Sequence, residues 1–309
     1  MGDTAKKICV AGSLNVDLTL RLERFHQPGE TVIAKNIHTY AGGKGGNQAV
    51  ATAKLGHAVM MVGMLGEDDN GRFYRETLRQ NGVDAECVGS DANTPSGTAI
   101  IEVDDRGENR IAIIPGTNGL VDNAYMDSML ERMLTCDIFL MQYEIDLNTV
   151  AHLAKILRRE GKCLILDPAP AASAPEELYK NVDYITPNAT ELAALTGAST
   201  DTPEEVVAAA RMLLERGVGA VIAKLGGKGC LYVDRKTIMP VSGFKVNTVD
   251  TTAAGDSFNA GFAVALAEGM PIEKALRFAN AVGALSTTGA GAQSSMPTRA
   301  QVEALLAKT

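Results

Sequence analysis

Short apolar runs alternate with amphipathic segments along most of the chain. Runs such as Ile8–Ala11, Val59–Val62 and Ile138–Met141 contain no charged residue, which is typical of strands buried on both faces of a sheet. Helical segments follow such runs, and several end near a glycine such as Gly56 or Gly82. The alternation predicts a mostly parallel central sheet covered by helices on both faces. The further strands and helices that the pattern predicts are Asn47–Leu55, Asp69–Gln80, Leu147–Glu160, Cys163–Leu166, Tyr184–Thr186, Ala189–Leu195, Pro203–Arg216, Ala220–Lys224, Ile272–Thr287 and Thr298–Ala307.

A second, smaller sheet is indicated by segments in which apolar and polar residues alternate. Leu18, Leu20 and Leu22, for example, alternate with polar side chains, which is the pattern of a half-exposed antiparallel strand. No linker separates two autonomous domains, so we expect one domain of residues 1–309 with a lid, formed by about 15–42 and 96–115, inserted in it. The strands expected in the lid are Asp17–Glu23, Thr31–Tyr40, Gly97–Val103 and Arg110–Ile114.

Composition and charge argue against several classes of partner. Apolar residues make up 46% of the chain and charged residues 21%, as in an ordered globular protein. The net charge of −8 argues against a surface for nucleic acid or anionic membrane, where clustered Lys and Arg supply the affinity. The five cysteines share no C-x-x-C spacing, and neither a secretion signal nor a membrane span is evident. We therefore expect a cytoplasmic protein with buried, reduced thiols.

A turn of small residues before a predicted helix combines an anion site with a carboxylate. Ala253, Ala254 and Gly255 have little or no side chain, so their backbone N–H groups can approach a phosphate closely. The helix that follows adds the positive end of its dipole. Asp256 lies just inside this helix, where it could serve as a base. The alternative is that an acidic residue in the first turn only stabilises the helix dipole.

The small-residue turn belongs to a longer stretch that resembles a known signature. Asp250–Gly261 is similar to the C-terminal signature of the ribokinase-type sugar kinases, the phosphofructokinase-B superfamily, and Gly42–Ala49 resembles their N-terminal signature. Further motifs that stand in the family's order are Gly12–Asp17, Thr186–Glu191, Leu225–Gly229 and Gly291–Ser295. The resemblance spans nearly the whole chain and implies a ribokinase-like three-layer α/β/α sandwich with a small β-sheet lid.

The resemblance implies an ATP-dependent kinase that phosphorylates D-ribose at the 5-hydroxyl to give D-ribose 5-phosphate. A kinase for deoxyribose, ketodeoxygluconate, fructose or a nucleoside, and a sugar sensor without catalysis, stay open as alternatives. The implied cofactors are ATP, Mg²⁺ and an activating K⁺. The alternating pattern and exposed edge of the small sheet also favour a homodimer formed through the lids.

The resemblance also implies roles for individual residues on the sugar side. Asn15 and Asp17 are two residues apart on a predicted strand and therefore share a face, where an amide and a carboxylate suit a vicinal diol. Ordinary turn chemistry is the alternative for this pair, and a flexible connection between lid and body is the alternative for Gly42–Gly46. The implied sugar-binding residues are Asn15, Asp17, Gly43, Lys44, Gly45, Asn47, Glu144 and Asp256. Asp256 is the implied general base, and the turn of Ala253, Ala254 and Gly255 is the implied anion hole.

A second set of residues is expected on the nucleotide side. Asn188 and Glu191 match family positions near the phosphates and Mg²⁺, although the same spacing is that of a helix-capping pair. The residues implied to bind the nucleotide are Asn188, Glu191, Lys224, Gly226, Gly227, Gly229, Gly255 and Asn280. No Walker A motif is present, and no G-x-G-x-x-G fingerprint follows the first strand.

The third expected site is a cation loop. One carboxylate among carbonyl oxygens suits a large monovalent ion better than Mg²⁺, which requires tight octahedral geometry, and the resembled family binds K⁺ here. A plain glycine-rich loop is the alternative. The residues of this loop are Asp250, Thr252, Ser286, Gly289, Gly291 and Ser295. One departure from the family pattern is Asp167, where many ribokinases have Asn; this position is not a ligand in the pattern.

Overall fold

The computed structural model describes residues 6–308, and its main body is built on a nine-stranded sheet. The strand order is β13-β12-β11-β10-β9-β8-β1-β4-β5, parallel from β11 to β5, with an antiparallel β12-β13 hairpin at one edge. The mostly parallel sheet predicted from the apolar runs is therefore confirmed. Its strands are β1 (Ile8–Ala11), β4 (Val59–Gly66), β5 (Asp84–Asp91), β8 (Ile138–Gln142), β9 (Cys163–Asp167), β10 (Tyr184–Ile185), β11 (Ala220–Lys224), β12 (Gly229–Val233) and β13 (Ile238–Ser242).

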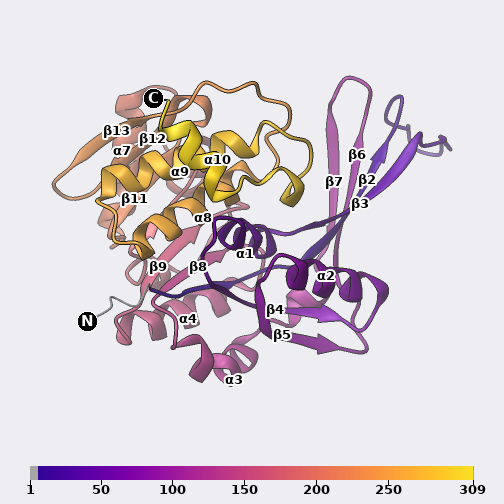
Figure 1. Cartoon of the computed structure of the whole chain (residues 1–309), viewed down its shortest axis with the longest axis horizontal. Coiled ribbons are helices and arrows are strands. Elements are labelled where there is room, and N and C mark those ends of the chain that lie inside the picture. Colours follow the sequence, from indigo (N-terminus) through magenta and orange to yellow (C-terminus); the bar gives the residue numbers. More distant parts are fainter. Residues whose placement is uncertain (1–5, 309) are drawn as a thin grey trace.

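Helices cover both faces of this sheet and enclose two hydrophobic cores (Figure 1). Successive residues of a strand point to opposite faces, so Ile8 and Val10 belong to one core and Cys9 and Ala11 to the other. The first core is covered by α1 (Lys44–Lys54), α2 (Asp69–Gln80), α8 (Ala254–Ala267), α9 (Ile272–Ser286) and α10 (Arg299–Leu306). The second is covered by α3 (Asn123–Met133), α4 (Leu147–Arg159), α5 (Glu176–Tyr179), α6 (Ala189–Thr196) and α7 (Pro203–Glu215).

A separate four-stranded sheet projects from the body, as Figure 1 shows. Its strands, in spatial order, are β3 (Asn36–Gly42), β2 (Asn15–Arg21), β6 (Gly97–Val103) and β7 (Asn109–Ile114). The chain enters this sheet directly after β1 and returns through β3 into α1. The pairs β2-β3 and β6-β7 are antiparallel, but β2 and β6 are parallel. Alternation had predicted half-exposed antiparallel strands; this is confirmed for the pairs β2-β3 and β6-β7 and is wrong for β2-β6, because alternation reports which face is exposed and not the direction of each neighbour.

The elements differ from the sequence prediction in a few places. Helix α1 begins at Lys44, three residues before its predicted start, because Gly45 packs directly on β1-β2 backbone: a Cβ there would lie 2.7 Å from the Ser13 nitrogen and oxygen. The strand predicted from Thr31 begins only at Asn36. Strands β5, β12 and β13 and helix α3 were not predicted, because their short or mixed patterns lack a clear period.

Three further features bear on the sequence expectations. All five cysteines are free thiols; four are buried and Cys163 is half-buried. No helix between residues 6 and 308 has both the length and the apolar character needed to cross a bilayer. Residues 1–5, where no secretion signal was expected, lie outside the described part of the chain. Helices η1 (Gly116–Leu120), η2 (Gly226–Lys228) and η3 (Gln293–Ser295) are single 3₁₀ turns near the site described next.

Candidate active site

The turn of small residues predicted as an anion site stands at the N-terminus of α8. Ala253 precedes this helix in the left-handed conformation, with φ of 57°, and is the one non-glycine residue between 6 and 308 with a positive φ. The Ser257 amide makes the first helical bond, to the Ala253 carbonyl at 2.9 Å, so the preceding amides lie at the open end of the helix. One of them, that of Ala254, donates within the turn to the Thr251 carbonyl at 3.2 Å. The amides of Gly255 and Asp256 therefore become the main candidates for anion binding.

Asp256 is held by two amide side chains from α1. Its carboxylate accepts from Asn47 Nδ2 at 3.0 Å and from Gln48 Nε2 at 3.1 Å. The side chain is only 4% exposed. Burial raises the pKa of Asp256 to about 6; the Lys44 ammonium opposes this shift, whereas Asp167 and Glu144 reinforce it. A carboxylate with a pKa close to neutral is suited to general-base catalysis.

The residues expected to bind the sugar come together beside Asp256. Glu144 accepts from the Lys44 amide at 2.9 Å and from the Ser13 hydroxyl. Burial, with Glu144 and Asp256 nearby, raises the pKa of Asp17 to about 7. Gly43 has a φ of 77°, which a larger residue would adopt only with strain. Together these groups form a polar cluster beside Asp256, which we call the sugar side of the site.

Asn15 is positioned by a residue that the sequence prediction missed. Its Oδ1 accepts from Asn118 Nδ2 at 2.7 Å, and Asn118 Oδ1 accepts from the Leu14 amide at 2.8 Å. Asn118 is buried in η1, where the chain returns from the small sheet. A buried amide in a short polar loop has no periodic signal, so only the structure shows its role.

The nucleotide-side residues line one cavity of about 790 Å³. Each of the eight residues predicted there contributes to its wall, including Asn280 and the Gly226–Gly227 turn. Lys44 and Asp256 line it too, and both also contact or face the sugar-side residues, so they lie where the sugar side meets this cavity. Phe244, Val246 and Ala284 add apolar wall near Asn280, which suits a nucleobase.

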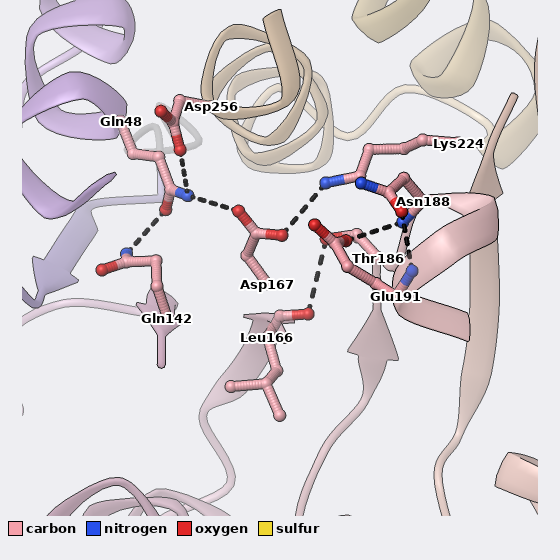
Figure 2. Close-up of polar contacts among 9 residues, drawn as sticks. All are labelled: Gln48, Gln142, Leu166, Asp167, Thr186, Asn188, Glu191, Lys224 and Asp256. Carbon is pink, nitrogen blue, oxygen red and sulfur yellow. Dashed lines mark hydrogen bonds and ion pairs between the residues drawn. The ribbon is translucent and has the colours of Figure 1, made fainter. Parts of the chain in front are cut away.

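Asn188 and Glu191 form the capping box that was the alternative interpretation of their spacing. The Asn188 side chain accepts from the Glu191 amide at 2.8 Å, and the Glu191 carboxylate accepts from the Asn188 amide at 2.7 Å. Burial raises the pKa of Glu191. Both residues nevertheless line the cavity, and Figure 2 shows their side chains close to that of Lys224, so capping and phosphate-side binding are compatible.

The residues of the expected cation loop are adjacent in space. Asp250 accepts from Thr252 at 2.9 Å (amide) and 2.7 Å (hydroxyl) and from the Gly291 amide at 3.0 Å. The Ser295 hydroxyl donates to the Gly291 carbonyl at 2.6 Å, and Gly289 packs against Ser295. The sixth residue, Ser286, ends α9; its hydroxyl donates to the Gly283 carbonyl at 2.8 Å. One carboxylate, the Gly291 carbonyl and the hydroxyls of Thr252 and Ser295 thus lie in one loop, a donor set that suits a large monovalent cation.

The described part of the chain holds no cluster of side chains suitable for a resident divalent metal. Among residues 6–308, no group of three or more His, Cys, Asp or Glu side chains could hold a metal ion. Mg²⁺ commonly binds through one or two carboxylates together with substrate phosphates. The donors at the cavity, with Asn188 and Glu191 on its wall, fit this second arrangement.

We expect the sugar-phosphorylating activity to depend on the ionisation of Asp256. A general base acts only when deprotonated, and the pKa of Asp256 is raised to about 6. At saturating sugar, kcat/KM for ATP should therefore fall about tenfold per pH unit below pH 6 and level off above it. Rates measured from pH 5 to 8, with protein integrity checked at each end, test this. An acid limb near pH 4 would contradict the effect of burial.

The fold and this site define a class of protein: an α/β phosphotransferase with a turn of small residues at a helix N-terminus, three lysines on the wall of the cavity and a buried carboxylate beside them. The chain belongs to the pfkB family of carbohydrate kinases, whose family model matches residues 5–299.

Individual relatives match the chain over almost its whole length. The ribokinase of Bacillus subtilis is 40% identical over 97% of this chain and 99% of its own. The structure of Arabidopsis thaliana ribokinase complexed with ribose and ATP superposes with a TM-score of 0.94 and 38% identity, covering 98% of this chain and 99% of that one. The deoxyribokinase of Salmonella typhi is 36% identical over 94% of this chain and 95% of its own.

Proposed function

We propose that this carbohydrate kinase transfers the γ-phosphoryl group of ATP to the 5-hydroxyl of D-ribose, giving D-ribose 5-phosphate and ADP. The observation that carries the proposal is the position of Asp256. It is buried beside Asn47 and Glu144 on one side and lines the nucleotide cavity on the other. The similarity to ribokinases, one of them bound to ribose and ATP, supports the choice of sugar.

Asp256 and the α8 turn divide the chemistry between them. The carboxylate takes the proton of the sugar hydroxyl while the new O–P bond forms and the bond from the γ-phosphorus to the bridging oxygen breaks, releasing ADP. The Gly255 and Asp256 amides, at the positive end of the helix dipole, stabilise charge on the moving phosphoryl group. In phosphoryl transfer, such positioning and charge stabilisation provide most of the catalysis.

The site itself is short of positive charge, which gives Mg²⁺ a clear role. Among the described residues, the site holds five carboxylates (Asp17, Glu144, Asp167, Glu191 and Asp256), whereas three lysines line its cavity: Lys44, Lys224 and Lys245. Burial by itself lowers the pKa of Lys44, but the surrounding carboxylates outweigh it and raise the pKa overall. Mg²⁺ bound to the nucleotide would neutralise phosphate charge, with Asn188 and Glu191 as the nearest candidates to hold it.

A sugar panel tests the proposed function. Initial rates of ADP formation with ribose, 2-deoxyribose, fructose, ketodeoxygluconate and adenosine should give the highest kcat/KM with ribose. A higher value with deoxyribose is the second candidate, favoured by the similarity to a deoxyribokinase. A higher value with another substrate would refute the ribose assignment. Sugar binding without any ADP formation would indicate a sensor.

We expect K⁺ to activate the enzyme more than Na⁺ does. Asp250, Thr252, Gly291 and Ser295 would hold the cation, and the loop leads directly into the α8 turn. Because carbonyl ligands in a fixed loop fit the larger ion, the smaller ion should leave the turn less well ordered. Rates in KCl and NaCl at equal ionic strength should differ several-fold. Equal rates would make the loop purely structural.

The small sheet is the proposed interface of a homodimer. Ile37, Ile111 and Ile113 are 58%, 56% and 53% exposed on its strands, whereas exposed apolar side chains of soluble proteins are usually scattered. Light scattering should give a dimer mass at micromolar concentration. Replacing Ile111 and Ile113 by Asp should give a monomer, and Met212→Asp on α7, 41% exposed on the main body, should not. A monomeric wild type would refute the interface.

The proposal also includes a cytoplasmic location, where ATP is available and reducing conditions keep cysteines as free thiols.

A further inference from the structure

Asp167 stands at the centre of the polar network shown in Figure 2. It is the last residue of the central strand β9, whose carboxyl end lies at the cavity. Asp167 is only 1% exposed. One carboxylate oxygen pairs with Lys224 Nζ at 3.0 Å. The other accepts from Gln48 Nε2 at 3.2 Å. Asp167 thus connects a cavity lysine with the helix that supports the catalytic base.

The Lys224 ammonium lies directly beside the anion turn. A Cβ built on Gly255 would be 3.2 Å from Lys224 Nζ, so this charge is next to the amides proposed to bind the transferred phosphoryl group. A lysine has a flexible four-carbon side chain, and its ammonium keeps one position only when an acceptor fixes it. In this chain Asp167 supplies that acceptor.

Gln48 transmits the position of Asp167 to Asp256. Its single amide nitrogen donates to both carboxylates, at 3.2 Å to Asp167 and 3.1 Å to Asp256. Ionised carboxylates only accept hydrogen bonds, so the side that faces them must be the NH₂ group. The Gln48 oxygen then accepts from Gln142 Nε2 at 2.7 Å, which holds the amide in this orientation. Gln48 and Gln142 are both fully buried.

We propose that Asp167 and Lys224 act as one charge pair in phosphoryl transfer, in which Asp167 is a positioning residue: it holds the Lys224 ammonium beside the Gly255 turn and, through Gln48, holds the Asp256 carboxylate. The inference rests on the proposed kinase function and adds two requirements to it: a fixed position of the Lys224 ammonium and a fixed position of the Asp256 carboxylate. Asp167 touches no reacting atom itself. It acts through the Lys224 ammonium, which lies beside the transferred phosphoryl group, and through the Asp256 carboxylate, which takes the proton of the sugar hydroxyl.

The pair explains why an asparagine at position 167 should be harmful in this chain. An asparagine would present one oxygen and one NH₂ group to two donors, Lys224 and Gln48. One of those buried donors would lose its acceptor, and the ammonium would lose its counter-charge. Because one acceptor serves both donors, positions 167 and 224 should be energetically coupled.

A double-mutant cycle tests the coupling. Asp167→Asn and Lys224→Met should each lower kcat by about 10–100-fold, and the double variant should lose at least about fivefold less than the product of the two single losses. Gln48→Met removes the bridge while leaving both carboxylates, and should also lower kcat about 10-fold. Asp183→Asn is the matched control: Asp183 pairs with Arg158 at 3.0 Å beside the start of β9, away from the cavity. It should keep kcat.

The pH profile separates positioning from loss of structure. The groups facing Asp256 are Lys44, Asp167, Glu144 and Asp17, and the charge of Asp167 contributes to its raised pKa. Removing that charge should move the acid limb of the profile to lower pH, whereas Gln48→Met removes a donor to the ionised carboxylate and should move it to higher pH. Melting temperatures of all variants show whether they fold.

Several outcomes would overturn the inference. Independent, fully multiplicative losses would show that the two residues do not act as a pair. If the acid limb of the pH profile does not move in Asp167→Asn, the charge of Asp167 does not affect the ionisation of Asp256. A defect cured by raising Mg²⁺ would make Asp167 a metal ligand instead. If Asp167→Asn does not fold, normal kcat and an unmoved limb in Gln48→Met would refute the link to the base. A wild type that phosphorylates no sugar would refute the proposed function, a result distinct from all of these.

Discussion

Asp256→Asn is expected to lower kcat by about 10²–10⁴-fold, because it removes the proposed general base. An asparagine can still occupy the space between Asn47 and Gln48, but it cannot take up the proton of the sugar hydroxyl. The Gly255 amide and the cavity are unchanged, so ATP binding measured by calorimetry should stay within about threefold of wild type. Near-normal turnover would remove Asp256 from the mechanism.

Asp69→Asn is the matched control for this variant. Asp69 also occupies the first turn of a helix, α2, but it is exposed. If Asp256 served only the helix dipole, the two substitutions would have similar small effects on stability and no effect on turnover. The large difference expected between them therefore separates the catalytic from the dipole interpretation.

Asp256→Asn should also change how the stability of the protein depends on pH. The pKa of Asp256 is raised to about 6 in the folded state, against 3.8 for the free side chain, so the folded state binds more protons between these values. Stability therefore falls as pH rises from about 4 through 6. An asparagine does not titrate, and the donor that it leaves without an acceptor, Asn47 or Gln48, is lost at every pH. Between pH 4 and pH 8, the stability of the variant relative to wild type should therefore rise by on the order of 1–3 kcal/mol. Thermal melts at both pH values measure this.

Gly42→Ala is expected to raise KM for the sugar by about 10–100-fold. A Cβ at Gly42 would lie 2.1 Å and 2.6 Å from the two carboxylate oxygens of Asp17, so Asp17 would have to leave its position. Gly42 has no positive φ, so an alanine there causes no backbone strain. The expected rise in KM comes from the steric clash with Asp17 on the sugar side of the site. Because Gly42 does not line the nucleotide cavity, KM for ATP should change little.

Gly119→Ala is the control variant for Gly42→Ala. Gly119 also lacks a positive φ, and nothing lies within 4 Å of a Cβ built on it. This variant should have the sugar KM of the wild type. Equal KM values for wild type and Gly42→Ala, measured with saturating ATP, would show that Asp17 does not hold the sugar.

Local patterns were sufficient to predict much of the fold. The runs Ala220–Lys224 and Gly97–Val103 are strands with the predicted bounds, and Asp69–Gln80 is a helix with the predicted bounds. Each has a clear period or a strong end signal, such as the Asp68 side chain that accepts from the Gly71 amide at 2.7 Å. The N-terminal part of α1 was missed because glycines are poor helix formers, and Lys44–Gly46 becomes helical only where it packs on Ser13.

The residues of the candidate site likewise fall into those that the sequence could predict and those that it could not. Groups that stand in linear motifs, such as Asp256 in its turn and Asn188 with Glu191, could be located from spacing and resemblance alone. Asn118, Gln48 and Asp167 could not, since each acts through a partner far away in the chain, such as Asn15 for Asn118 and Lys224 for Asp167. Asp167 looked unimportant because no motif connects it with Lys224.

By itself the sequence determined the parallel α/β body, the separate small sheet and the turn before α8, because periodicity, capping residues and small-residue turns act over a few neighbouring residues. Only the tertiary structure decided which polar groups meet. Packing α1 against α8 places Gln48 between Asp167 and Asp256, and burial there raises the pKa of Asp256 towards neutral. Desolvation and charge interactions depend on distances across the folded molecule, and a linear order of residues does not contain those distances.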